Sequence, residues 1–283
     1  MILATSITAD YLERSQPFFE SVCKYFPTHD KAGQPNRRLC FTISFATTIE
    51  GWECIETAMP ECAWQPTNRP AYHSLQHGEF VKYLPYKENS APDKIDPDDI
   101  NPDDLICFID SDMVLQRPFD LEFPSTRGIL VTACSYPALS LRAVVGNLLE
   151  AGSGKPMPRI AKSVIKKYDI KEQYTEFCAG FIIATVASWE NFYIYAKRLY
   201  PLLDSFKHHA AWQLLINLVA LQHFPRVSLL PPHICNATWY EGTGMMADGS
   251  IFVGRKGVVG ADGAIKDEVM AEQVYFKHTK FDT

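Results

Sequence analysis

The sequence predicts an α/β fold in which a mostly parallel central sheet is flanked by helices and followed by a helical C-terminal elaboration. Short apolar runs recur along the chain, and they are continuous rather than alternating, which is typical of strands that are buried on both faces. Stretches with helical spacing of apolar residues lie between and after these runs. The 283 residues are 47% hydrophobic and 21% charged, so the chain can bury a sizeable core.

The first half of the chain alternates strand and helix patterns. MILATSI, residues 1–7, predicts a strand, and residues 10–26 predict a helix with Asp10 as its cap. Further strands are expected where β-forming residues cluster: RRLCFTISF (37–45), LICFI (105–109) and GILVTAC (128–134). A Pro-rich stretch at 58–72 and an acidic, Pro-rich stretch at 86–104 interrupt this series, and the second is interpreted as a solvated surface insertion.

The second half is mainly helical. Helices are expected over 158–170, 187–203 and 208–224, where apolar residues follow a helical stripe. Strands are expected at FCAGFIIAT (177–185) and QVYFKH (273–278). No repeat or linker divides the chain, so a single domain over 1–283 is predicted, with 1–135 as one half and 136–283 as the other.

The charge of the chain, its N-terminal segment and its cysteines indicate which partners and which cellular location to expect. The net charge is −6 and no run of Lys or Arg dominates, so neither nucleic acid nor an anionic membrane is the expected partner. No signal peptide or transmembrane segment is recognised, and a cytoplasmic protein is expected. Oligomeric state is not indicated. The eight cysteines form no Cys-x-x-Cys pair and are expected to be reduced, mostly in the core: Cys23, Cys40, Cys54, Cys62, Cys107, Cys134, Cys178 and Cys235.

The most informative segment is LICFIDSDMVLQRPFD, residues 105–120, where an apolar strand ends in Asp110 and Asp112. Two carboxylates so close together raise each other's pKa, which suggests that a positive group lies between them. Three interpretations are open: a solvated turn, a phosphatase of the haloacid dehalogenase type with an aspartate nucleophile, or a divalent cation site that clamps a diphosphate.

The rest of the chain disfavours the phosphatase. Its nucleophile motif usually opens the sequence and is followed by a further acidic motif, whereas Asp110 lies more than a third of the way along and no Asp-Asp pair follows. A nucleotidyltransferase is also disfavoured, because ATSITADYLERS after the first strand lacks the Gly-rich, basic phosphate loop of that class.

ICFIDSDMVLQRPFD resembles the Asp-x-Asp segment of nucleotide-sugar-dependent glycosyltransferases of the GT-A fold, and the order of parts is similar to glycogenin and the bacterial lipopolysaccharide galactosyltransferases. The resemblance implies hexose transfer from a nucleotide-sugar, with a UDP-sugar favoured, to a glycan or other hydroxyl acceptor. It also implies Mn²⁺ or Mg²⁺ and retention of the anomeric configuration. An inverting reaction would need a protein base, for which the sequence offers only Glu176, Glu241 and Asp248.

The same resemblance assigns the nucleotide-sugar site. Base-binding residues of the family match the end of the first strand at Ala4, Thr5, Ser6 and Thr8, and Asp110 and Ser111 belong to the donor site. AYHSLQHGEF is similar to the family's Tyr-x-Arg-Leu helix, with matches at Tyr72 and Leu75. Ser74 replaces the family's Arg, and Lys82 is the candidate substitute.

Further matches follow the acid pair. EFCAGFIIAT is similar to a pocket-lining strand, with Phe177 and Gly180 matching, Cys178 in place of Asn, and Glu176 as the nearest candidate carboxylate. AAWQLLINLV retains Gln213 and Asn217 of an Asp-Gln-Asp-x-x-Asn helix, whose acids are replaced by Trp212 and Leu214.

The tail VYFKHTKFD resembles a segment that supplies a metal ligand and a diphosphate contact. The matching residues are His278 as the third ligand beside Asp110 and Asp112, and Lys280 at the diphosphate, with His233 as the alternative ligand. The departures at Ser74, Trp212 and Leu214 leave one further alternative open, a domain of this kind that binds a nucleotide-sugar or glycan without turnover.

Overall fold

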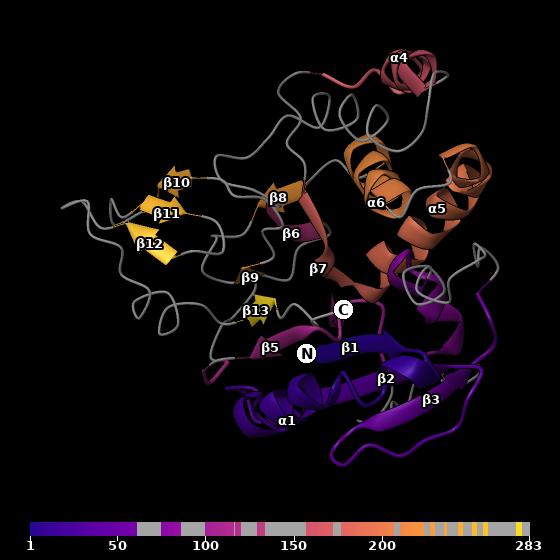
Figure 1. Ribbon diagram of the computed structural model, residues 1–283. Coiled ribbons are helices and arrows are strands. Elements are labelled where there is room, and N and C mark those ends of the chain that lie inside the picture. The colour runs from indigo at the N-terminus through magenta and orange to yellow at the C-terminus, as the bar shows by residue number, and fades with distance from the viewer. Residues whose placement is uncertain are drawn as a thin grey trace.

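The computed structural model shows a seven-stranded sheet with helices on both faces (Figure 1). It describes residues 1–60, 75–85, 100–115, 117–119, 129–133, 157–171, 177–206, 210–223 and the short strands 227–229, 235–236, 243–245, 251–253, 257–259 and 276–278.

The sheet has the strand order β3-β2-β1-β4-β7-β6-β8. Its strands are β1 (Ile2–Ile7), β2 (Arg37–Ile43), β3 (Glu53–Thr57), β4 (Leu105–Ile109), β6 (Ile129–Ala133), β7 (Phe177–Thr185) and β8 (Val227–Leu229). All neighbouring pairs are parallel except those that β7 makes with β4 and β6. The predicted α/β class and mostly parallel sheet are therefore confirmed.

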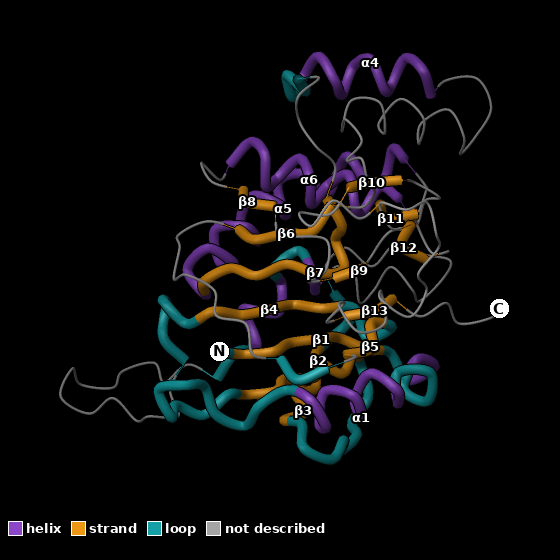
Figure 2. Tube along the Cα trace, turned by 90° about the vertical axis from the view of Figure 1, so that its left-hand side faces the viewer, coloured by secondary structure: helices purple, strands orange, loops and turns teal. Residues whose placement is uncertain are grey.

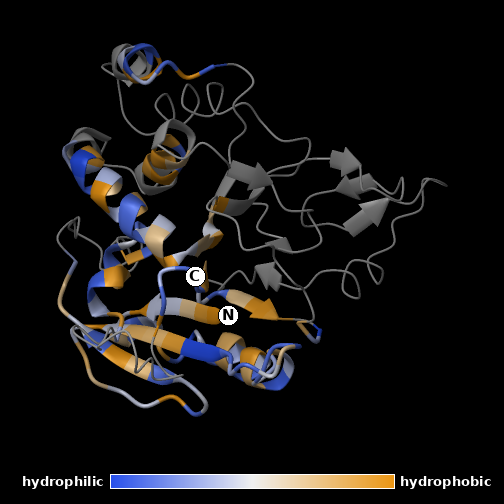
Figure 3. Ribbon diagram, turned by 180° about the vertical axis from the view of Figure 1, so that it is seen from behind, coloured by the Kyte–Doolittle hydropathy of each residue, from blue (hydrophilic) through white to orange (hydrophobic). Residues whose placement is uncertain are grey.

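Alternate residues of the central strands enter two separate cores, which explains why these strands are apolar throughout. One core holds Leu3 and Cys107 and packs against α1 (Gln16–Tyr25). The other holds Ala4 and Phe108 and packs against η2 (Glu79–Tyr83), α5 (Val186–Phe206) and α6 (Ala210–His223). Hydrophobic residues colour much of the described sheet in Figure 3. A further helix, α4 (Met157–Lys167), precedes β7.

The helix after β1 begins later than the sequence predicts. A short 3-10 turn, η1 (Ala9–Tyr11), comes first, and α1 starts at Gln16 after Ser15. Asp10 does not cap the helix, because its Oδ1 accepts a hydrogen bond of 2.6 Å from Thr8 Oγ1. Pro17 has no backbone N–H, which costs nothing in the first turn of α1 because N–H groups there have no partner within the helix, and its fixed φ suits a helix start.

Two small three-stranded sheets lie outside the main one. The first has the order β5-β13-β9, formed by β5 (Met113–Leu115), β13 (Phe276–His278) and β9 (Cys235–Asn236). The second consists of β10 (Thr243–Met245), β11 (Ile251–Val253) and β12 (Gly257–Val259). The strand expected at QVYFKH is confirmed as β13, whereas β3, β5 and β8 to β12 have no counterpart among the predicted elements.

The described cysteine side chains are free, as expected. Cys40 and Cys107 are buried, Cys54 is half-buried and Cys23 is exposed. The other four cysteine side chains and the acidic stretch 86–99 lie outside the described residues. None of the helices that the structure describes has the length and apolarity to cross a bilayer.

Candidate active site

The acid pair lies in a tight turn where β4 leaves the sheet. Met113 N donates a hydrogen bond of 3.1 Å to Asp110 O, which closes the four-residue turn around Ser111 and Asp112. Ser111 is buried, while Asp110 and Asp112 are half-buried. The turn therefore leaves both carboxylates partly accessible at the carboxyl edge of the parallel strands, where open α/β sheets bind ligands.

Helix α1 holds this turn in place from one side. Ser15 Oγ, just before the helix, donates to Ser111 Oγ at 2.9 Å in a fully buried contact. Six residues later, Ser21 Oγ accepts a hydrogen bond of 3.0 Å from Leu115 N. The backbone that carries the acids is thus fixed to a helix as well as to the sheet.

Strand β1 meets the end of β4 beside the acids. Thr5 Oγ1 donates to Ile109 O at 2.7 Å, and this hydrogen bond is buried. The predicted base-binding residues are all buried, with exposed fractions of 0% for Ala4 and Thr5, 2% for Ser6 and 6% for Thr8. The hydroxyls of Thr5 and Thr8 already bond to the protein, so any contact with a ligand from these two residues would come from their other atoms.

Asp110 is held from several directions. Its N–H donates to Gly180 O at 2.9 Å, and its Oδ1 accepts a hydrogen bond from Gln76 Nε2. A Cβ placed on Gly180 would lie 2.5 Å from Asp110 Oδ2, so only glycine leaves room for the carboxylate at this point of β7. The space beside Gly180, which the family resemblance places in a pocket-lining strand, is thus occupied by Asp110 itself.

Gln76 is a site residue that the sequence did not single out. It lies one residue after Leu75, within the segment that the family resemblance covers, and its side chain is 1% exposed. A polar side chain in the apolar neighbourhood of Leu75 and Phe80 was the available signal, because a buried amide needs a partner.

The C-terminal strand brings His278 to the same turn. β13 pairs antiparallel with β5, and His278 is the register partner of Met113, the residue after Asp112. Figure 2 shows β5, β13 and β9 together beyond the ends of β1 and β4. The structure thus brings the backbone of His278 beside the acid pair. Its side chain and that of Gln213 in α6, together with the whole of Glu176, Lys280 and His233, lie outside the described residues.

Lys82, the expected substitute for the missing Arg, is engaged elsewhere. Its Nζ lies 3.3 Å from Glu79 Oε1 and 4.9 Å from the centroid of the Tyr193 ring. Glu79 is almost fully buried, so its carboxylate needs this cation. A role for Lys82 at a phosphate would require the side chain to leave both contacts.

The donor set suits a hard divalent cation. Two carboxylates in one turn, with a histidine in register on the neighbouring strand, offer the oxygen and imidazole ligands that Mn²⁺ accepts. Among the described side chains, no three His, Cys, Asp or Glu residues gather closely enough to hold a metal, and His278 would have to complete the set.

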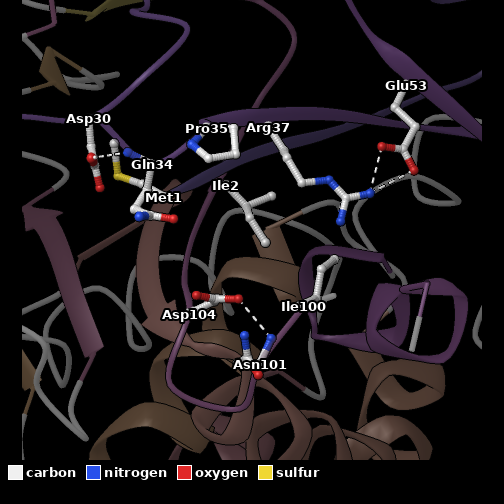
Figure 4. A pocket seen from close by; sticks show the side chains of 10 residues that line it. All are labelled: Met1, Ile2, Asp30, Gln34, Pro35, Arg37, Glu53, Ile100, Asn101 and Asp104. Atoms are coloured by element: carbon white, nitrogen blue, oxygen red, sulfur yellow. Dashed lines mark hydrogen bonds and ion pairs between the residues drawn. The ribbon is translucent and has the colours of Figure 1, made fainter. Parts of the chain in front are cut away.

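A hollow of about 440 Å³ lies at the opposite, amino edge of the sheet (Figure 4). The charged side chains that line it already interact with one another or with neighbouring backbone N–H groups. Arg37 forms an ion pair of 2.6 Å with Glu53, Asp30 Oδ1 accepts from Gln34 N at 2.8 Å, and Asp104 Oδ2 accepts from Asn101 N at 2.7 Å. This hollow is remote from the acid pair, and its acidic groups are already satisfied.

Comparisons with known proteins agree with this geometry. No protein-family model and no curated protein matches the chain in sequence. The galactosyltransferase LgtC, solved in complex with donor and acceptor sugar analogues, matches 100% of this chain and 88% of its own, with a TM-score of 0.54 and 11% identity. An active-site mutant of LgtC matches 83% of this chain and 74% of its own, with a TM-score of 0.50 and 11% identity.

The bifunctional glycosyltransferase WbbM, solved in its apo form, matches 99% of this chain with a TM-score of 0.53 and 14% identity. This chain spans 45% of the WbbM chain. The likeness extends over nearly the whole of this chain, and the chain therefore has the GT-A fold that these glycosyltransferases share.

Proposed function

We propose that the protein is a metal-dependent glycosyltransferase that moves a hexose from a nucleotide-sugar, with a UDP-sugar as the favoured donor, to a glycan or other hydroxyl acceptor. The observation that carries the proposal is the tight turn of Asp110 and Asp112 at the carboxyl edge of a GT-A sheet, with His278 in register beside it. Residues 1–135 would form the donor half and residues 136–283 the acceptor half of a single domain.

In this proposal Asp110, Asp112 and His278 hold the cation, Mn²⁺ or Mg²⁺. Such a cation would neutralise the charge that develops on the departing nucleoside diphosphate. The protein's own contribution is to hold the ligands of the cation in fixed positions. The turn is fixed by Ser111 and by β7, so the carboxylates are already in place before the donor arrives.

The family resemblance extends the proposal to the stereochemistry and to the remaining residues. Transfer would retain the anomeric configuration, with the leaving phosphate assisting the acceptor hydroxyl. Glu176 and Gln213 would face the sugar, Lys280 the diphosphate, and the end of β1 at Thr8 the base.

A thermal-shift panel tests the proposal directly. UDP, GDP, CMP and UDP-sugars are added to the wild type and to Asp112→Ala, each with and without Mn²⁺. We expect one nucleotide to raise the melting temperature only with Mn²⁺, and Asp112→Ala to lose this response, because the metal then lacks a ligand. If no nucleotide responds in the wild type, the proposal fails.

Donor hydrolysis separates an enzyme from a binding domain. The engagement of Lys82 with Glu79 and Tyr193 is the observation that favours binding without turnover, because it leaves the position of Ser74 without an obvious cationic substitute. Release of UDP from UDP-sugars in the presence of Mn²⁺ is expected of the enzyme. Metal-dependent binding without any UDP release would establish the binding domain instead.

A further inference from the structure

Gln76 reaches the acid pair from a part of the chain that belongs to neither β4 nor β7. Its side chain is 1% exposed, and its flanking residues Leu75 and His77 are both 0% exposed. The segment then turns sharply, since Gly78 N donates to Leu75 O at 3.0 Å and Gly78 has a φ of +87°. Residues 75–78 therefore form a buried, tightly turned support for the Gln76 side chain.

The support packs directly on α5. A Cβ on Gly78 would lie 2.8 Å from Trp189 O, so the turn approaches the helix backbone as closely as a glycine allows. Phe80, two residues later, stacks edge-on against Trp189 with the ring centroids 5.1 Å apart. Motion of Gln76 relative to the sheet would require this packing to open.

The contact with Asp110 has a defined direction. A carboxylate only accepts hydrogen bonds, so the amide of Gln76 must present Nε2 and donate to Oδ1. A bond to a charged acceptor is stronger than one between neutral groups. On the other side Oδ2 lies over Gly180, where even a Cβ would clash. The plane of the carboxylate is thus set by two contacts from two different segments.

A neutral donor suits this place. A Lys or Arg in place of Gln76 would also donate a hydrogen bond to Asp110. Its positive charge, however, would cancel that of the carboxylate and repel a cation bound beside it. An amide orients the carboxylate and leaves its negative charge for the ligand.

We propose that Gln76 is a positioning residue, which holds Asp110 in the orientation that binds the cation and the donor. This inference rests on the proposed function, because it gives the role of a residue that acts through Asp110. Partners of this kind, which orient a metal ligand without touching the metal, typically change metal affinity by about 10- to 100-fold when they are removed.

The test compares Gln76→Met with the wild type. Methionine keeps the length and volume of the side chain but removes the donor. Mn²⁺ binding is measured by the loss of the free-ion EPR signal, with and without saturating UDP, and UDP affinity without metal is measured separately. We expect Mn²⁺ affinity in the presence of UDP to fall by about 10- to 100-fold, while UDP affinity without metal stays the same.

Two further variants keep the test decisive. Gln76→Asn retains the amide but is one methylene too short, and it should show the same loss even if Gln76→Met folds poorly. Gln34→Met, on the exposed amino edge of the sheet, is the matched control and should bind Mn²⁺ like the wild type.

The outcomes separate this inference from the proposed function. If the wild type binds Mn²⁺ with UDP, Asp112→Ala does not, and both Gln76 variants bind as tightly as the wild type, the inference is wrong and the proposed function stands. If the Gln76 variants lose UDP affinity equally with and without metal, Gln76 is merely structural and the inference is again wrong. If the wild type itself does not bind Mn²⁺ with UDP, both fail.

Discussion

Gly180 in β7 offers a substitution that should weaken ligand binding strongly while leaving the fold intact. Its φ is not in the left-handed region, so Gly180→Ala places no strain on the backbone of the strand. Replacing glycine by alanine also lowers the conformational entropy of the unfolded chain. At a position with a compatible backbone conformation, this raises the free energy of unfolding by about 0.4–1 kcal/mol. The protein should therefore still fold, although crowding of Asp110 and Met113 by the new methyl group should lower its stability by about 1–3 kcal/mol.

The added methyl group would nevertheless displace Asp110. A Cβ at Gly180 lies 2.5 Å from Asp110 Oδ2, whereas ordinary van der Waals contact begins at 3.4 Å, so the carboxylate must move by about 0.9 Å, the difference between the two. Ligand sites tolerate displacements of roughly 0.5 Å, and an error of about 1 Å can reduce activity by about 100-fold. We expect a loss of this order in Mn²⁺-dependent UDP affinity.

Calorimetric titration of UDP in the presence of Mn²⁺ measures the effect, and thermal unfolding without ligand measures the stability. Gly33→Ala is the matched control, because nothing lies within 4 Å of the added Cβ and the site is far from the acid pair. It should cost some stability through its φ of +79° and leave binding unchanged. Wild-type UDP affinity in Gly180→Ala would refute the reasoning, since Asp110 would then tolerate the displacement.

Three further predictions concern stability and thiol chemistry. Gly78→Ala combines a left-handed φ with a contact of 2.8 Å to a backbone carbonyl of α5, and urea unfolding should show a loss of roughly 2–4 kcal/mol; an unchanged midpoint would contradict the packing. Thr5→Val removes the buried hydrogen bond to Ile109 O and should lower stability by about 1–2 kcal/mol, measured in the same way. The hydrogen bond from Cys40 lowers the pKa of Cys54 to about 7, so the rate of alkylation of Cys54 should rise with pH through a midpoint near pH 7 and level off only well above it. In Cys40→Ala the midpoint should move up toward that of an ordinary thiol, and mass spectrometry of the alkylated peptide would show whether it does.

The strands of the main sheet could be predicted where the sequence gives a strong local signal. LICFI is apolar throughout and FCAGFIIAT is apolar up to its last residue, Thr185, because both faces of β4 and β7 are covered, and both strands were predicted correctly. β3 was missed because ECIET carries two glutamates, Glu53 and Glu56, which remain exposed at the edge of the sheet.

The site itself was predictable only in part. Asp110 and Asp112 follow an apolar run and could be found by inspection, and the turn that joins them is confirmed. Gln76 could be suspected as a polar residue among apolar ones, but its role could not be predicted, because it depends on a contact between segments that are distant in sequence. Asp10 is a comparable case, since its carboxylate could cap a helix or accept from Thr8, and only the structure shows the second.

The pairing of β13 with β5 has a consequence for how the protein acquires its site during folding. Met113 and His278 are close in space but far apart in sequence, so their pairing closes a long loop and is disfavoured until the rest of the sheet has formed. The turn with Asp110 and Asp112 is held by β1, β4, β7, α1 and Gln76, which all precede β13 in the chain, and it can form earlier. A nascent chain would then carry a folded acid pair before its last strand docks, and a cation and nucleotide that bind there would favour the docked state.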